Sequence, residues 1–87
     1  MYYVYTLKSL RDGKLYTGKT SDLKKRLEKH YNGEVPATRR RRPLKLIYYE
    51  AFENKTDCGA EELFLKSGIG RESLKHRLKN SLRGGIA

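Results

Sequence analysis

The chain has 87 residues, with 20 lysines and arginines against 10 aspartates and glutamates, and a formal net charge of +10. This length allows one small domain. The positive charge suits a polyanionic partner, and nucleic acid is a better candidate than an anionic membrane surface. A basic face that is merely solvated is the simpler alternative. The lone Cys58 excludes a disulfide framework and a thiolate metal cluster, and no apolar run approaches the ~20 residues of a membrane span, so we expect a cytoplasmic protein.

Residues 2–17 predict a β-hairpin, because aromatic and β-branched residues flank the strong turn signal Asp12-Gly13. Any loop with an even number of residues puts Tyr5 and Tyr16 on the same face of the sheet. A tight two-residue turn would leave them about four residues apart, roughly 13 Å along the strands. If both tyrosines serve one site, the loop should therefore be wider. Two ordinary sheet tyrosines are the alternative.

Residues 22–31 predict a helix, with Ser21 as its N-cap and Asn32-Gly33 beyond its end. One helical stripe holds two leucines that must face the sheet, so Arg26 and His30 lie at the edge of the buried face. An arginine held there needs a charged or polar partner, unless it extends to solvent. The stripe comprises Leu23, Arg26, Leu27 and His30.

Residues 34–43 predict a loop that carries four consecutive arginines, Arg39, Arg40, Arg41 and Arg42. They cannot all pair with acids, and on a mobile loop they suit the phosphates of a nucleic-acid backbone. A solvated charge run is the alternative. Lys24 and Lys25, on the outward face of the preceding helix, are further candidates for nucleic-acid contact.

Residues 44–52 predict a third strand, apolar enough to lie in the middle of the sheet. A helix through Lys66 follows, capped by Asn54 or Thr56, and residues 67–70 break it before a last helix over 72–82. The predicted packing stripe of the helix that ends at Lys66 is Ala60, Leu63, Phe64 and Ser67. We therefore expect one α/β (α+β) domain over residues 1–82, in the order β-β-α-β-α-α, with residues 83–87 as a flexible tail.

The side chains that could converge form a reasonable set for hydrolysis of a phosphodiester. A carboxylate can hold one Mg²⁺ or Mn²⁺ with waters, and the ion and an arginine stabilise charge on the phosphate. A tyrosine oxygen can take a proton from water if nearby cations lower its pKa, and a histidine can orient groups or shuttle a proton. The candidates are Tyr5, Tyr16, Lys19, Arg26 and His30, with either Glu61 or Glu62 as the acid. These residues alone indicate a basic nucleic-acid binder for which nuclease activity is an option.

Several segments, in their order and spacing over about residues 2–80, resemble the GIY-YIG nuclease superfamily. They look most like its small stand-alone bacterial members, which are related to the N-terminal nuclease domain of the excision-repair protein UvrC. The matching segments are Tyr3-Val4-Tyr5 for the first motif, Tyr16-Thr17-Gly18 for the second, residues 22–30 with Arg26, residues 42–50, and residues 62–68 with Glu62. Tyr3 stands in place of the first motif's glycine, and Thr17 in place of the second motif's isoleucine.

The resemblance implies a three-stranded antiparallel sheet flanked by helices, and cleavage of single DNA strands by an activated water. It selects Glu62 over Glu61 as the ligand of one divalent metal ion. It implies that Tyr5 is the general base, assisted by Tyr16, and that Arg26 stabilises the phosphate. His30 matches a position that is histidine or tyrosine in relatives, and Asn80 could match a later asparagine.

Two functions follow as expectations from the resemblance. The first is a metal-dependent DNA endonuclease, structure-specific or non-specific, of the kind that acts in DNA repair. The second is a non-catalytic nucleic-acid-binding module on the same fold. DNA is the expected partner, with RNA as an alternative and no membrane. Because few side chains of so small a protein can reach base edges, we expect little sequence specificity, so a partner protein is a candidate for directing it.

Overall fold

A computed structural model describes residues 1–82; residues 83–87, where we predicted a flexible tail, lie outside the described residues. Its centre is an antiparallel sheet of β1 (Tyr2–Ser9), β2 (Leu15–Thr20) and β3 (Leu44–Phe52), in the order β2-β1-β3. The predicted fold class is confirmed. The prediction that the third strand is central is wrong, because β1 is buried on both faces whereas β3 exposes Tyr49 and Glu50 to solvent.

The hairpin of β1 and β2 has a wide loop over residues 10–13, rather than the tight turn that Asp12-Gly13 suggested. The amide of Ser9 donates to the carbonyl of Lys14, 2.9 Å away, and Gly13 closes the loop with a φ of 74°. Tyr5 therefore lies opposite Gly18, and Tyr16 lies opposite the residue two positions further along β1. The two tyrosines share a face as diagonal neighbours, with ring centroids 6.5 Å apart.

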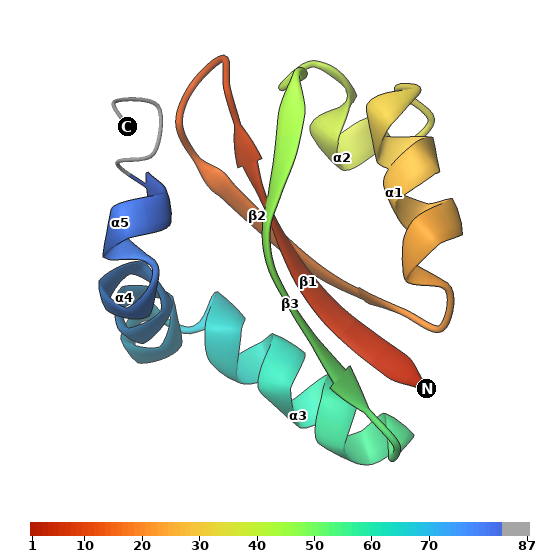
Figure 1. The fold of residues 1–87 in the computed structure, drawn as a ribbon, viewed down its shortest axis with the longest axis vertical. Coiled ribbons are helices and arrows are strands. Elements are labelled where there is room, and N and C mark those ends of the chain that lie inside the picture. The colour runs from red at the N-terminus through yellow and green to blue at the C-terminus, as the bar shows by residue number, and fades with distance from the viewer. Residues whose placement is uncertain (83–87) are drawn as a thin grey trace.

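Helices cover both faces of the sheet (Figure 1). One face carries α1 (Leu23–Tyr31) and α2 (Pro36–Arg39), and the other carries α3 (Lys55–Lys66), α4 (Gly68–Arg77) and α5 (Lys79–Leu82). On the α3 side, Val4 of β1 packs against Cys58, Leu65 and Leu74, each at most 2% exposed. Within residues 1–82, no helix is long and apolar enough to cross a membrane.

Several helix boundaries differ from those predicted from the sequence. Asp22, rather than Ser21, caps α1, because its carboxylate accepts from the amide of Lys25. The expected loop over residues 34–43 contains the short helix α2, which starts at a proline, a residue whose fixed φ suits a first helical position. Ser67 ends α3 as predicted, but α4 begins immediately after it, and residues 72–82 are divided between α4 and α5.

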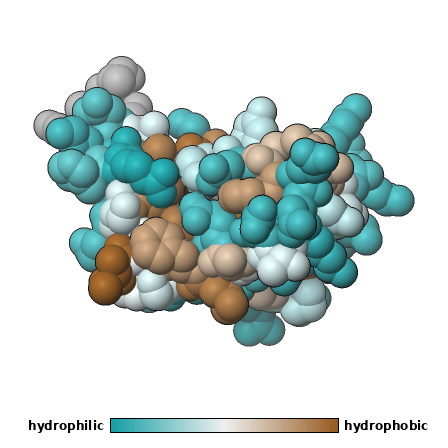
Figure 2. Space-filling model, turned by 90° about the horizontal axis from the view of Figure 1, so that it is seen from below, coloured by the Kyte–Doolittle hydropathy of each residue, from teal (hydrophilic) through white to brown (hydrophobic). Residues whose placement is uncertain are grey.

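The predicted packing face of α3 is also wrong. Leu63 and Phe64 are 70% and 43% exposed, whereas Cys58 and Leu65 are 2% exposed. The small side chain of Cys58 lets the helix approach β1, and the more apolar stripe consequently faces solvent. Figure 2, which views the molecule from the side on which α3 lies in Figure 1, shows apolar side chains on this surface. The same rotation turns Glu62 toward β2.

The tight junction of α3 and α4 provides a test of the fold. A Cβ at Gly70 would overlap the carbonyl group of Phe64, and backbone atoms cannot move aside. We expect Gly70→Ala to lower the free energy of unfolding by about 1–3 kcal/mol. Gly68→Ala is the matched control: a Cβ there meets nothing within 4 Å, so stability should stay equal or rise slightly. Urea denaturation followed by circular dichroism measures both, and equal effects would contradict this packing.

Candidate active site

Four of the predicted site residues meet on the α1 side of the sheet. The Tyr5 hydroxyl oxygen lies 2.8 Å from Nε2 of His30 and 3.3 Å from Nε of Arg26, which donates to it. The ring centroid of Tyr16 lies 5.3 Å from that of His30. Tyr5 and His30 are buried, and Tyr16 and Arg26 are partly buried, so the cluster reaches solvent through the latter two. The helical spacing of Arg26 and His30 brings both onto one phenol.

Gly18 makes room for this arrangement. A Cβ at position 18 would lie 2.6 Å from the Tyr5 hydroxyl oxygen and 2.8 Å from the carbon that bears it. The phenol therefore lies directly over the backbone of β2, where any larger residue would push it away from His30. The glycine of the second motif thus has a steric role in the cluster, separate from any need for an unusual backbone angle.

The hydrogen bonds form a directed chain. Arg26 can only donate, so the Tyr5 oxygen accepts from it, and the Tyr5 proton is free to be donated to Nε2 of His30. A neutral imidazole that accepts at Nε2 carries its proton on Nδ1. That nitrogen lies 2.7 Å from the hydroxyl oxygen of Thr38, which is buried in α2 and accepts the bond. The chain therefore runs from Tyr5 through His30 to Thr38.

Burial sets the protonation states of the chain. It lowers the pKa of His30 to about 4, with the nearby Arg26 charge adding to the effect, so the imidazole is neutral at pH 7. Burial also raises the pKa of Tyr5, and the hydrogen bond from Arg26 opposes that rise only in part. The condition that cations would lower the tyrosine pKa is thus not met, because desolvation outweighs them. Hydrogen bonding to Tyr5 raises the pKa of Arg26, which stays charged.

Lys19 and Glu62 lie on the other face of the sheet. Lys19 is opposite Val4 in the register, so it faces α3, and its Nζ is 3.8 Å from Oε1 of Glu62. The Nζ of Lys66 lies 3.1 Å from Oε2 of the same carboxylate, which is 13% exposed. Glu62 is close enough to Tyr5 for its charge to raise the pKa of the phenol. The edge strand β2 therefore separates the Tyr5 cluster from Glu62 and the two lysines beside it.

The two adjacent glutamates have different surroundings. Glu61 faces Glu50 of β3 and Arg77 of α4, and burial together with the Glu50 charge raises its pKa. Glu62 faces β2, where Lys19 lies beside its carboxylate. Among residues 1–82, no three metal-binding side chains cluster. A Mg²⁺ ion is commonly held by one or two carboxylates together with waters and substrate phosphates, so Glu62 fits a single such ion if the lysine contacts yield.

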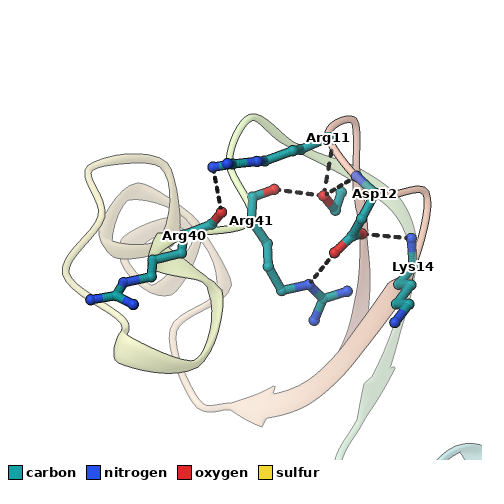
Figure 3. Close-up of polar contacts among 6 residues, drawn as sticks. Arg11, Asp12, Lys14, Arg40 and Arg41 are labelled. Atoms are coloured by element: carbon teal, nitrogen blue, oxygen red, sulfur yellow. Dashed lines mark hydrogen bonds and ion pairs between the residues drawn. The ribbon is translucent and has the colours of Figure 1, made fainter.

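The four consecutive arginines have different surroundings, although the sequence suggested one shared role. Nε of Arg41 lies 3.3 Å from a carboxylate oxygen of Asp12, and Ser9 donates to the Arg41 carbonyl (Figure 3). Arg42 donates to the carbonyls of Arg39 and Tyr31. Both guanidinium groups thus bind atoms of the protein itself. Figure 3 shows the guanidinium group of Arg40 pointing away from the hairpin loop, and Arg39 is also exposed.

The remaining candidates lie outside the cluster. Lys24 and Lys25 are exposed on α1, as predicted, and Asn80 is exposed in α5. Thr38 and Gly18 are the contributions that sequence reasoning missed. The signal for Thr38 was its place three residues after Val35, which would have put both on one face had residues 36–39 been recognised as a helix.

These polar groups lie on both faces of the sheet around β2 in a small α+β fold, and comparison with known families identifies the class of protein. The family described as the GIY-YIG catalytic domain matches residues 1–79. The chain belongs to this family, which lies within the GIY-YIG endonuclease superfamily and acts on nucleic acids.

Similar proteins belong to one group of small bacterial proteins. A UPF0213 protein of Clostridium perfringens is 48% identical over 86% of this chain and 81% of its own length. A UPF0213 protein of Pediococcus acidilactici is 43% identical over 92% of this chain and 83% of its own. The solution NMR structure of a UPF0213 protein from Bacillus halodurans superimposes with a TM-score of 0.53 at 37% identity, covering 85% of this chain and 82% of that one.

Acid should destabilise the protein through His30. Folding lowers the pKa of His30 from 6.5 to about 4, so protonation favours the unfolded chain. The contribution is fully present above pH 6.5 and is lost as the pH falls to about 4. Urea denaturation at pH 7.5, 5.5 and 4.5 measures this loss, which should be smaller in His30→Gln and retained in His76→Gln, the exposed control. Identical pH dependence in parent and His30→Gln would contradict the assignment.

Removing the Thr38 hydroxyl should change the tautomer of His30. In Thr38→Val the Nδ1 proton has no acceptor, so the Nε2-protonated form should become populated, at a stability cost of about 1 kcal/mol. Nitrogen-15 NMR of the imidazole reports the tautomer directly. Thr17→Val is the matched control, since it loses a buried hydroxyl bond of 2.9 Å to Thr6 without touching His30, and Thr38→Ser should restore the parent spectrum. An unchanged tautomer in Thr38→Val would refute the chain.

Proposed function

We propose that this chain is a metal-dependent DNA endonuclease, which hydrolyses a phosphodiester bond with an activated water. The observation that supports this most is the buried Tyr5 hydroxyl, held between a charged arginine and a neutral histidine. A sheet tyrosine with only a packing role needs one hydrogen-bond partner. This phenol accepts from Arg26 and faces His30, so its second lone pair can take a proton from water while its own proton moves to the histidine.

The proposed proton path uses the directed chain. A water beside the phosphate gives a proton to the hydroxyl oxygen of Tyr5, while the original Tyr5 proton moves to Nε2 of His30. The resulting imidazolium keeps its Nδ1 bond to Thr38. The hydroxide attacks phosphorus, the P–O bond to the leaving oxygen breaks, and solvent protonates that oxygen. The proton on His30 then returns through Tyr5 to solvent, which restores the neutral imidazole. Because both transfers occur together, the step needs no free phenolate, and the raised pKa of Tyr5 does not prevent it.

Charge stabilisation falls to groups on both sides of β2. Arg26 is charged and partly buried, so its remaining N–H groups can bind the phosphate oxygens, with Tyr16 beside it. Lys19 is exposed on the other side and can contact the same phosphate. A Mg²⁺ or Mn²⁺ ion held by Glu62 would act as a Lewis acid toward the phosphate. Lys24 and Lys25, with Arg39 and Arg40, extend the basic surface available to the nucleic-acid backbone.

One observation favours the alternative, a non-catalytic nucleic-acid-binding module. Both oxygens of Glu62 already face lysines, 3.8 and 3.1 Å away, and a metal ion must compete with them. A binding module would keep these ion pairs permanently and use only the positive surface. In either role the proposed partners are DNA or RNA and a protein that directs the chain to its target, and the buried thiol of Cys58 suits a cytoplasmic, reducing location.

A nicking assay on supercoiled plasmid distinguishes the two functions. The parent should cleave with Mg²⁺ or Mn²⁺ and not with EDTA. Glu62→Ala and Arg26→Ala should each lose about 10²- to 10³-fold in rate, because each removes an electrostatic stabiliser. Glu61→Ala is the matched control, since its carboxylate faces Glu50 and Arg77, away from Lys19.

DNA binding by Glu62→Ala should survive, because this residue contributes no positive charge. Mutants that cleave as fast as the parent would refute the proposed site. A parent protein that binds DNA in a salt-sensitive way without cleaving would favour the binding module.

A further inference from the structure

A cavity of about 490 Å³ lies between the hairpin loop, the end of α1, α2 and the start of β3. We propose that this cavity, here the arginine pocket, binds one unpaired nucleotide, and that the substrate is therefore a single-stranded or branched nucleic acid. This inference rests on the proposed function, whose substrate it specifies. The residues that line the pocket are Arg11, Tyr31, Arg39, Arg40, Arg42, Pro43 and Leu44.

Backbone carbonyls hold two of the four arginines that line the pocket. Arg11 donates from Nη1 to the carbonyl of Arg40, 3.0 Å away, and Arg42 donates to the carbonyls of Arg39 and Tyr31. The guanidinium group of Arg42 also lies against Gly33, where a Cβ would come within 2.7 Å of it. Backbone carbonyls orient these groups without neutralising them. Within residues 1–82, the ion pairs of the protein involve none of the pocket's arginines.

The rest of the lining is apolar or aromatic. Tyr31 is 45% exposed, although a tyrosine at the end of an amphipathic helix could have packed inward, and Pro43 and Leu44 are its neighbours in the pocket. A backbone phosphate alone would need only the arginines. A flat aromatic ring next to several guanidinium groups matches a nucleotide, whose base stacks while its phosphate accepts hydrogen bonds. Bases inside a duplex stack on each other and pair across the helix, so an unpaired base is the one that is free to enter such a pocket.

The pocket is joined to the catalytic cluster through two pairs of chain neighbours. Tyr31 follows His30 in α1, and Arg39 follows Thr38 in α2. His30 and Thr38 point inward and bond to each other, whereas the following residue of each pair lines the pocket. A strand anchored by an unpaired nucleotide in the pocket would therefore run beside Tyr5. Selection for branched or single-stranded substrates would then come from this pocket, without any reading of base sequence.

The test compares two fluorescently labelled DNAs, a blunt duplex and the same duplex with a short single-stranded overhang. Binding is measured by fluorescence anisotropy in EDTA at one salt concentration. Tyr31→Ala should weaken overhang binding by about 5- to 150-fold, the range for loss of one base–aromatic stack, and change duplex binding less than twofold. Tyr49→Ala is the matched control, because Tyr49 is 55% exposed on β3 and lies outside the pocket.

A second variant tests the anionic half of the pocket. Arg39→Gln should weaken overhang binding, and circular dichroism should confirm that every variant folds. Equal losses by Tyr31→Ala on both DNAs would overturn the proposal, since the pocket would then bind duplex backbone, and so would unchanged overhang binding by this variant. Tyr31-dependent overhang binding without nicking by the parent would support the pocket and refute the nuclease. Nicking by the parent together with overhang binding that does not depend on Tyr31 would support the nuclease and refute the pocket.

Discussion

The buried hydroxyl of Tyr5 is the constraint on which the rest of the structure depends. It lies in the central strand at 1% exposure, where an unsatisfied phenol would cost about 1–3 kcal/mol. It is satisfied by a helix that presents two polar residues one turn apart, Arg26 and His30. It also requires a glycine in the neighbouring strand and, beyond the histidine, a hydroxyl from α2. Strand order, α1 and α2 are thus coupled through one oxygen atom.

Features that depend on parity or helical period could be predicted from the sequence. Tyr5 and Tyr16 share a face for any loop with an even number of residues, so that inference did not depend on the length of the turn. Arg26 and His30 lie one turn apart on any helix. Features that depend on which residues a helix or strand packs against in the folded protein could not be predicted. The most apolar stripe of α3 faces solvent, because the approach of Cys58 to β1 decides the rotation of that helix.

The limits of prediction are similar within the candidate site. Adjacent glutamates differ by about 100° around a helix, and the sequence does not say which direction faces Lys19. Four identical arginines in a row give no hint that Arg41 pairs with Asp12 while Arg42 holds the ends of two helices. Both distinctions depend on tertiary neighbours distant in sequence. A strong local charge pattern therefore predicts a polyanionic partner, but it does not show which side chains are free to meet it.

The division of the site by β2 bears on how a nuclease of this form would work. On one side a buried phenol is held neutral by desolvation; on the other a carboxylate is held by lysines. In the proposed reaction the α1 side would activate water and bind the phosphate through Arg26, and the α3 side would add Lys19 and a metal ion on Glu62. A substrate phosphate at the strand edge would join them, since its negative charge would attract Arg26 and Lys19 together and loosen the hold of Lys19 on Glu62. Tight positioning of the substrate strand would then matter more than the intrinsic acidity of any single group, which is why a basic pocket braced by backbone carbonyls would suit this scaffold.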